Sequence, residues 1–235
     1  MYALIVLGGM MRIILLLFLT FNLFAQEEEE SSLGYVLLST YEMAAGTKYS
    51  QLEKNLVNEA KSQIELGYDG CVLYRHAQGA QRAFYLACFF QTMEQLGKIL
   101  SKPNDTSDEK QLFASHTDHI LAMDRNELEG PPNFIVFAKW LPAPMISWSE
   151  WGERMEKVGD AYSKAFGGCD GYGHAWGGEM GNYLVCGFDD WNDFAKKAEA
   201  VTPYLAEANQ GYNTIGTIAH SDDLLVRVFP AIESE

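Results

Sequence analysis

The chain has 235 residues, of which 32 are acidic and 17 are basic, giving a formal net charge of −15 at pH 7. Negative charge in this excess repels nucleic acid and anionic membrane surfaces, so we expect neither as a partner. The length suits one large domain or two domains of about 100 residues each.

The first 25 residues have the features of a secretory signal peptide. Arg12 is followed by an unbroken apolar run over residues 13–19, and the small residue Ala25 precedes Gln26. This order is typical of a signal that is removed on export. The run is shorter than a membrane span requires, and a retained N-terminal anchor is the alternative. We therefore expect a periplasmic or extracellular protein that opens with an acidic, flexible segment over residues 26–33.

The remaining chain contains the same unit twice. When the sequence is shifted by 98 residues, ten of the 21 positions from 70 to 90 are identical without a gap. The matches include both cysteines of each half, two tyrosines and one histidine. A second echo, at an offset of 104, aligns residues 116–121 (HTDHIL) with residues 220–225 (HSDDLL). The chain is therefore a tandem duplication, which we expect to span residues 34–123 and 133–230.

Each half has the pattern strand, helix, strand, strand, helix, strand. In the first half we expect strands over residues 35–39, 71–76, 84–90 and 119–123, with helices opening at Ser50 and Thr92. In the second half we expect strands over 134–139, 170–174, 183–188 and 224–229, with helices opening at Ser147 and over 191–198. Residues 124–132 are charged and end in Gly-Pro-Pro, which is typical of a linker, and residues 231–235 form a tail.

The four cysteines predict one disulfide within each half. Cys71 and Cys88 enclose sixteen residues, as do Cys169 and Cys186, and both intervals are centred on turn-forming sequence. In a β-hairpin each pair would lie directly opposite across the two strands. Each bridge would stabilise the fold by about 3 kcal/mol in the chain-entropy treatment. Bridges between the halves, or four free buried thiols, are the alternatives.

A βαββαβ unit is the ferredoxin-like fold, and two such units leave two bare sheet faces that can pack together. With its element order and paired motifs, the segment from Gly34 to Pro230 resembles the dimeric α/β-barrel superfamily in fused form. That superfamily includes cofactor-free monooxygenases acting on aromatic polyketides, haem-degrading oxygenases, dye-type peroxidases and isomerases. The resemblance therefore implies an α+β intramolecular barrel with a pocket between the sheets. It assigns neither a reaction nor a cofactor, and it leaves the oligomeric state open.

Strand alternation sorts the hairpin side chains onto two faces. Cysteine and leucine share one face, which we assign to the helices. The other face would line the pocket with Tyr74, Tyr85, His76, Tyr172, Tyr183 and His174. Ordinary packing between tyrosines on neighbouring strands is the alternative. The second hairpin is richer in glycine, so we expect the pocket to be favoured near Gly173, His174 and Trp176.

Four of the five histidines are matched between the halves, His76 with His174 and His116 with His220. If the edge strands of the two sheets meet, His76 would approach His220 and His174 would approach His116. Such pairs could bind a divalent metal with a neighbouring aspartate, or transfer protons with Tyr74 or Tyr172. Alternatively, His116 and His220 close turns before their strands.

The sequence thus predicts an exported protein that binds a small, partly apolar ligand between the repeats. Two alternatives remain. One is a cofactor-free or metal-assisted oxygenase or isomerase with His174 or His76 as base and Tyr172 or Tyr74 as partner. The other is a structural protein whose barrel is filled by its own side chains.

Overall fold

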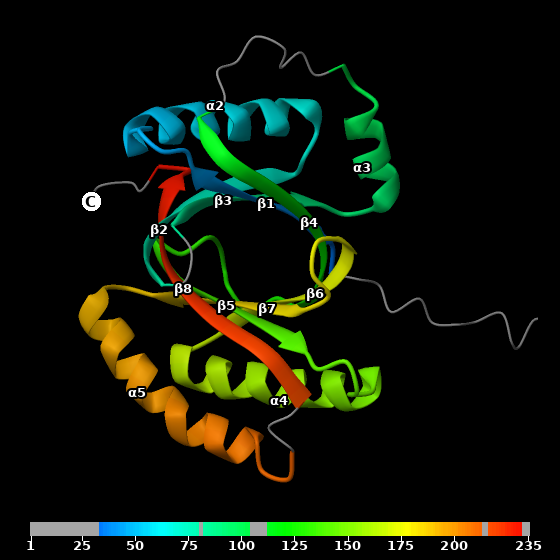
Figure 1. The fold of residues 1–235 in the computed structure, drawn as a ribbon, viewed down its shortest axis with the longest axis vertical. Helices are drawn as coiled ribbons and strands as arrows, with labels where there is room; N and C mark the ends of the chain where they lie inside the picture. The colour runs from blue at the N-terminus through cyan, green and yellow to red at the C-terminus, as the bar shows by residue number, and fades with distance from the viewer. Residues whose placement is uncertain (1–32, 80–81, 104–111, 213–215, 232–235) are drawn as a thin grey trace, which may run out of the picture. The chain divides into compact units, whose positions relative to one another are not determined.

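The computed structural model describes residues 33–79, 82–103, 112–212 and 216–231 (Figure 1). The expected signal peptide, the acidic segment up to residue 32 and the tail from residue 232 lie outside the described residues. The fold below therefore concerns the duplicated part of the chain.

The two halves have the same order of elements, βαββαβ, as expected for ferredoxin-like units. The first half consists of β1 (Tyr35–Met43), α2 (Tyr49–Leu66), β2 (Gly70–Gly79), β3 (Ala83–Phe90), α3 (Met93–Leu100) and β4 (Phe113–Arg125). The second half consists of β5 (Phe134–Pro142), α4 (Trp148–Phe166), β6 (Cys169–Gly177), β7 (Asn182–Phe188), α5 (Trp191–Ala208) and β8 (Thr217–Phe229).

Some boundaries differ from the sequence expectation. The cap of α4 is as predicted, because the Ser147 side chain accepts a hydrogen bond from the Glu150 amide. Helix α2 instead begins at Tyr49, where Gln51 reaches back to the amide of Lys48. Strands β4 and β8 are each 13 residues long because their first residues pair with β1 and β5, before the ladders with β6 and β2 begin at His119 and Asp223.

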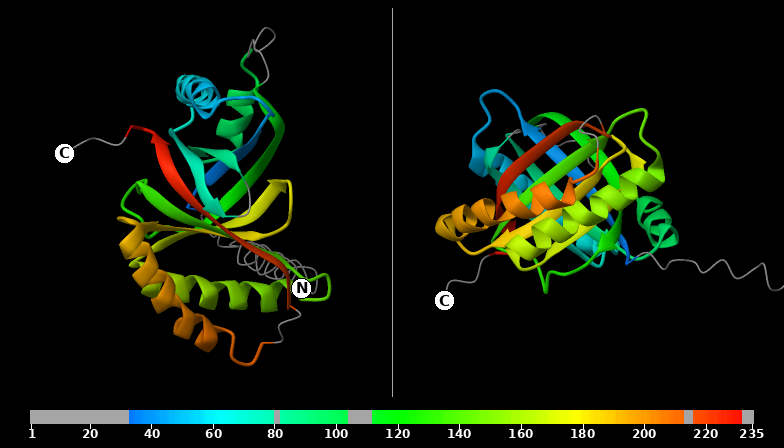
Figure 2. Two further views of the ribbon diagram at one scale, coloured as in Figure 1. Left: turned by 60° about the vertical axis from the view of Figure 1, so that its left-hand side comes forward. Right: turned by 90° about the horizontal axis from the view of Figure 1, so that it is seen from below.

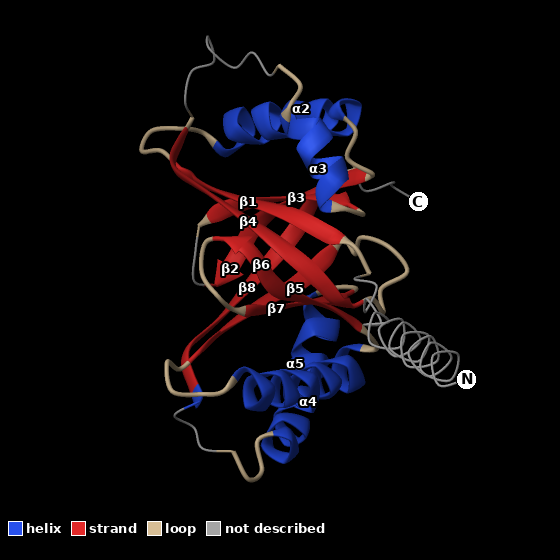
Figure 3. Ribbon diagram, turned by 90° about the vertical axis from the view of Figure 1, so that its right-hand side faces the viewer, coloured by secondary structure: helices blue, strands red, loops and turns tan. Residues whose placement is uncertain are grey.

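The eight strands form one closed antiparallel barrel in the order β1-β3-β2-β8-β5-β7-β6-β4. The two halves join at two seams, where β2 pairs with β8 and β6 pairs with β4. Helices α2 and α3 cover the outside of the first sheet, and α4 and α5 cover the second on the opposite side (Figure 3). Figure 2 shows the strands crossing beneath these helices. Closure leaves no free sheet edge, which removes the usual route to edge-to-edge association.

Three apolar clusters hold the fold together. One lies between α2, α3 and the first sheet, a second between α4, α5 and the second sheet, and a third inside the barrel. The cysteines and Leu73, Leu86 and Leu184 belong to the two clusters under the helices. The tyrosines at positions 74, 85, 172 and 183 belong to the interior cluster. The predicted separation of the two strand faces is therefore present in the fold.

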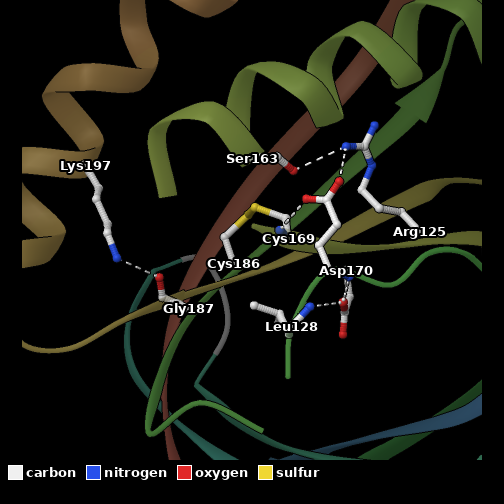
Figure 4. The surroundings of a disulfide bond; sticks show 9 residues. Arg125, Leu128, Ser163, Cys169, Asp170, Cys186, Gly187 and Lys197 are labelled. Carbon is white, nitrogen blue, oxygen red and sulfur yellow. Dashed lines mark hydrogen bonds and ion pairs between the residues drawn. A yellow bond between two sulfur atoms is a disulfide. The ribbon is translucent and has the colours of Figure 1, made fainter. Parts of the chain in front are cut away.

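Both disulfides lie within their own halves. Cys71 pairs with Cys88 and Cys169 with Cys186, at Cα separations of 4.1 and 4.4 Å, and each pair is directly opposite in the hairpin register. The second bridge lies beneath α4 and α5 (Figure 4). These pairings use all four cysteines and rule out bridges between the halves. Disulfides of this kind fit an oxidising compartment. Among the helices of the described residues, none is long and apolar enough to span a bilayer.

The linker between the halves crosses one end of the barrel and is held there by hydrogen bonds. The Asp170 carboxylate accepts from the amides of Glu127 and Leu128 at 2.8 and 3.0 Å (Figure 4). Arg227 donates to the Pro131 carbonyl at 2.7 Å, and Tyr74 donates to the neighbouring Pro132 carbonyl at 3.0 Å. The linker therefore closes this end of the barrel.

Candidate functional site

The barrel interior contains two hollows that share a wall. The apolar compartment, about 220 Å³, lies beneath the linker and is lined by residues such as Val36, Tyr74, Leu121, Leu128, Pro132 and Tyr172. The polar chamber, about 570 Å³, lies toward the opposite end, where β1 and β5 finish. Leu38, Tyr85 and Phe137 line both hollows and separate them.

Most side chains of the polar chamber come in pairs, one from each half. The repeat offset and the strand registers relate Leu38 to Phe137, Thr40 to Lys139, Tyr85 to Tyr183, Thr117 to Ser221 and His119 to Asp223. The chamber therefore lies on the pseudo-twofold axis of the duplication. Its two sides have similar shape but different chemistry, because only the tyrosine pair is identical.

On one side of the polar chamber, Asp223 lies between a tyrosine and a histidine. The Tyr85 hydroxyl donates to Asp223 Oδ2 at 3.0 Å, and Asp223 Oδ1 lies 4.0 Å from His76 Nε2. Tyr85 is 4% exposed and Asp223 is 5% exposed. Burial, and then the negative charge of Asp223, raise the pKa of Tyr85, so this phenol remains a proton donor.

A glycine makes the position of Asp223 possible. Gly79, opposite Asp223 on β2, has φ +132°, and a Cβ there would lie 2.5 Å from Asp223 Oδ1. A side chain at this position would displace the carboxylate. Gly79 in the β2–β3 hairpin therefore leaves the space that the Asp223 carboxylate occupies.

On the other side of the chamber, His119 takes the place of Asp223. Its ring makes an edge-to-face contact with Tyr183, with 6.2 Å between ring centroids. Burial is the main reason that the pKa of His119 is lowered, and the charges of Lys139 and His174 lower it further. Burial, followed by the charge of Glu179, raises the pKa of Tyr183 to about 12. Both groups are therefore neutral near pH 7.

Several buried polar atoms around the chamber have no hydrogen-bond partner among the described residues. They are Tyr183 Oη, His119 Nδ1, His174 Nδ1 and His76 Nε2. Tyr183 is 2% exposed, so its hydroxyl cannot be satisfied by bulk water. Leaving such a group unpaired costs roughly 1–3 kcal/mol. Only Tyr183 and His119 among these residues line the polar chamber.

The mouth of the polar chamber carries an ion pair. Lys139 Nζ lies 2.6 Å from Glu179 Oε2, which is on the turn between β6 and β7. Gly178 of the same turn packs so closely on His119 that a Cβ there would overlap the imidazole ring. This turn therefore both covers His119 and places a charge pair at the entrance.

No family model matches the chain, and no curated protein matches it. Solved structures do share the arrangement of its strands and helices. An anthrone oxidase-like protein has a TM-score of 0.59 at 9% identity, with 85% of this chain and 92% of that one covered. The chain has the dimeric α/β-barrel fold.

Two further structures with this fold illustrate its breadth. A protein from Lactobacillus acidophilus described as a candidate monooxygenase has a TM-score of 0.56 at 9% identity, covering 83% of this chain and 94% of its own. The chlorite dismutase of Candidatus Nitrospira defluvii has a TM-score of 0.50 at 10% identity, covering 85% and 93%. At these identities the likeness establishes the dimeric α/β-barrel fold alone.

The dimeric α/β barrel divides the tyrosines that the sequence grouped into one pocket. Tyr74 and Tyr172 line the apolar compartment, and the hydroxyl of Tyr74 is already bonded to the linker. Tyr183 lines the polar chamber, and Tyr85 lines both hollows. His76 and His174 share the interior face with these tyrosines, but neither lines the polar chamber directly.

The expected pairing of His76 with His220 does not occur, nor does that of His174 with His116. The seams form as predicted, but His76 lies opposite Leu225 and His174 opposite Leu121. His220 and His116 are each five residues away from those partners, about 16 Å along the strand. An odd offset also places them on the outer face, where His220 stacks on Trp140 and His116 on Tyr41.

The proposed metal ligands His76, His220, His174 and His116 are therefore dispersed. Each outer histidine contacts its own aspartate, His116 with Asp118 at 3.0 Å and His220 with Asp222 at 3.2 Å. Within the described part of the chain, no three His, Cys, Asp or Glu side chains gather as ligands of a metal ion would.

Two other expected pocket residues lie elsewhere. Trp176 is 65% exposed at the end of the β6–β7 hairpin and lines neither hollow. A Cβ on Gly173 would meet Asp124 and Asn182 rather than the interior side chains. Gly173 shares the strand face of Cys169, which is turned to the helices. Trp176 pairs with Ile120 beyond a register shift in the β4–β6 ladder, which turns it away from the interior face of His174.

The sequence reasoning missed Asp223, His119 and Phe137 as chamber residues. One signal was available, because His119 aligns with Asp223 inside an otherwise similar segment. A position that changes from acid to imidazole while its neighbours are retained indicates divergence of a shared site. Phe137 had no such signal, since an apolar residue in a strand is ordinary core.

Proposed function

We propose that this chain binds a small, partly apolar ligand inside the barrel, with the polar end of the ligand in the polar chamber. The observation that carries the proposal is Tyr183, which lines a chamber of about 570 Å³ and whose buried hydroxyl has no hydrogen-bond partner among the described residues. A ligand that hydrogen-bonds this hydroxyl and His119 would remove the cost of leaving them unpaired.

The apolar part of the ligand would extend toward the apolar compartment. Leu38 and Phe137 form the common wall, and both offer apolar surface to either side. Compact pockets with few polar groups on an apolar lining are typical of small-molecule sites. The proposed setting is an oxidising compartment outside the cytoplasm, which the two disulfides support.

The second candidate function is an oxygenase-type or isomerase-type enzyme. A neutral, buried His119 beside Tyr183 could accept a proton, and Tyr85, held by its hydrogen bond to Asp223, could orient the substrate. Solved structures of the same fold include proteins described as a candidate monooxygenase and as anthrone oxidase-like. The expected catalytic group would then be His119, whose pKa is also affected by the charge of His174.

Native mass spectrometry of the protein after export to the periplasm tests the binding proposal. We expect a small organic molecule to accompany the wild-type chain. Ser221→Phe places a ring in the chamber and should abolish this binding, whereas Ser62→Phe on the exposed side of α2 should retain it. Equal binding by both variants would contradict a barrel site, and an empty wild-type protein unaffected by ligand screens would favour a filled, structural barrel.

If a ligand is recovered, oxygen uptake and product formation separate binder from enzyme. A binder returns the molecule unchanged, while an enzyme converts it and loses that activity in His119→Gln or His174→Ala. Full activity in both variants would rule out the proposed acid–base role.

A further inference from the structure

We infer that the polar chamber selects a ligand with an organic ammonium head group over neutral or anionic analogues. The inference rests on the proposed function, since it concerns the same chamber. Three independent features of the chamber support it, namely its aromatic rings, its charges and the hydroxyl of Tyr183.

The wall of the chamber is a continuous row of aromatic rings. The Tyr85 and Phe137 ring centroids are 5.4 Å apart, those of Phe137 and Tyr183 are 5.7 Å apart, and Tyr183 meets His119 at 6.2 Å. Ring faces carry negative electrostatic potential and attract a cation that lies within about 6 Å of the centroid. Phe137 and Tyr183 stack at an interplanar angle of 19°, so an ammonium group would lie against the ring faces that this stack leaves uncovered.

The charges around the chamber are predominantly negative. Its lining includes the carboxylates of Glu42, Glu179 and Asp223 against one cation, Lys139, which is paired with Glu179. Asp223 is 5% exposed, so its field is screened far less than that of a surface carboxylate. An anionic ligand entering the chamber would be repelled by these groups, while an ammonium would be attracted.

The hydroxyl of Tyr183 gives the third indication. It is buried and has no partner among the described residues, and a neutral phenol oxygen can accept a hydrogen bond from an ammonium N–H or lie against polarised N-methyl groups. Since the chamber shares Leu38 and Phe137 with the apolar compartment, the body of the ligand would be apolar. The ligand class is therefore an apolar amine or quaternary ammonium compound.

Isothermal titration calorimetry with isosteric pairs tests the inference on the full protein. The probes are choline against 3,3-dimethylbutan-1-ol and tyramine against 4-propylphenol, which differ mainly in the cationic nitrogen. We expect the ammonium member to bind at least tenfold more tightly. Phe137→Leu should weaken the ammonium member at least fivefold while leaving the neutral member within twofold, and Phe89→Leu in the apolar compartment should leave the preference unchanged.

Lys139→Met provides a variant whose folding is not at risk, because the side chain is at the mouth of the chamber and partly exposed. It removes the cation and should tighten ammonium binding severalfold, with a smaller effect on the neutral isosteres. Neutral members that bind as tightly as their ammonium partners would overturn the inference and leave the binding proposal standing. If neither member of any pair binds measurably, the inference is overturned too. Native mass spectrometry decides the binding proposal separately.

Discussion

Asp223 and His119 occupy equivalent positions in the two halves of the barrel, each beside a buried tyrosine of the same hairpin position. Asp223 accepts a hydrogen bond from Tyr85, whereas His119 makes only an edge contact with Tyr183. The duplication has thus produced two tyrosine-containing pairs that face one chamber. One pair is joined by a hydrogen bond and the other is not. The difference between the two sides gives the following predictions.

Tyr85→Phe and Tyr183→Phe should differ in their effect on stability although they remove the same atom. Tyr85→Phe deletes a buried hydrogen bond to a carboxylate and should lower the free energy of unfolding by about 1.5–3 kcal/mol. Tyr183→Phe removes a hydroxyl that has no partner among the described residues, so in the ligand-free protein it should leave the free energy of unfolding unchanged or raise it by up to about 1–3 kcal/mol. Urea denaturation of both variants gives the comparison, and equal losses would contradict the assigned hydrogen bonding.

His119 should make stability depend on pH. Its folded-state pKa is lowered mainly by burial, so the unfolded chain binds the proton more tightly than the folded one. Stability is therefore complete above the unfolded value of about 6.5 and declines as the pH falls from there through the folded-state pKa.

His119→Gln should make this decline shallower, by up to about 1.4 kcal/mol per pH unit within that window. Urea midpoints measured between pH 4.5 and 8 provide the readout. Thr117→Val, a non-titrating change on the same strand, serves as the control and should keep the wild-type slope.

Gly178→Ala should destabilise the protein more than Gly46→Ala. Both glycines have positive φ, +39° and +81°, so alanine at either costs roughly 1–2 kcal/mol in backbone strain. Only at Gly178 would the new Cβ also overlap a neighbouring side chain, the ring of His119, whereas nothing lies within 4 Å at Gly46. We expect a further loss of about 1–3 kcal/mol at Gly178. Thermal unfolding of both variants tests this, and equal losses would show that His119 moves aside freely.

The two disulfides should contribute similarly to stability. Each joins cysteines separated by 17 positions, and loops of this size correspond to about 3 kcal/mol in the chain-entropy treatment. The double variants Cys71→Ala/Cys88→Ala and Cys169→Ala/Cys186→Ala should therefore lose comparable free energy of unfolding. A reduced wild-type protein as stable as the oxidised one would contradict the assignment of a stabilising role.

The sequence determined the features that depend on local periodicity and on the repeat. The duplicated hairpins predicted Cys71 opposite Cys88 and placed Tyr85 and Tyr183 inside, because alternation along a strand has a period of two wherever the strand pairs. The order of elements followed from helical and strand periodicity in the same way. Strand ends were predicted less well, since the polar first halves of β4 and β8 are extended by pairing with β1 and β5 rather than by their own composition.

Only the tertiary structure decided which residues meet across the two seams. His76 lies opposite Leu225 and beside Asp223, and not beside His220, because closure of the barrel fixes the stagger of β2 against β8. A shift by an odd number of residues turns a side chain to the other face, so small differences in stagger exchange an interior partner for an outer one. The same closure brings His119 and Asp223, which lie about 100 positions apart in the chain, to one chamber. No local pattern encodes that stagger, which is why the sequence specified the two strand faces but not the composition of the site.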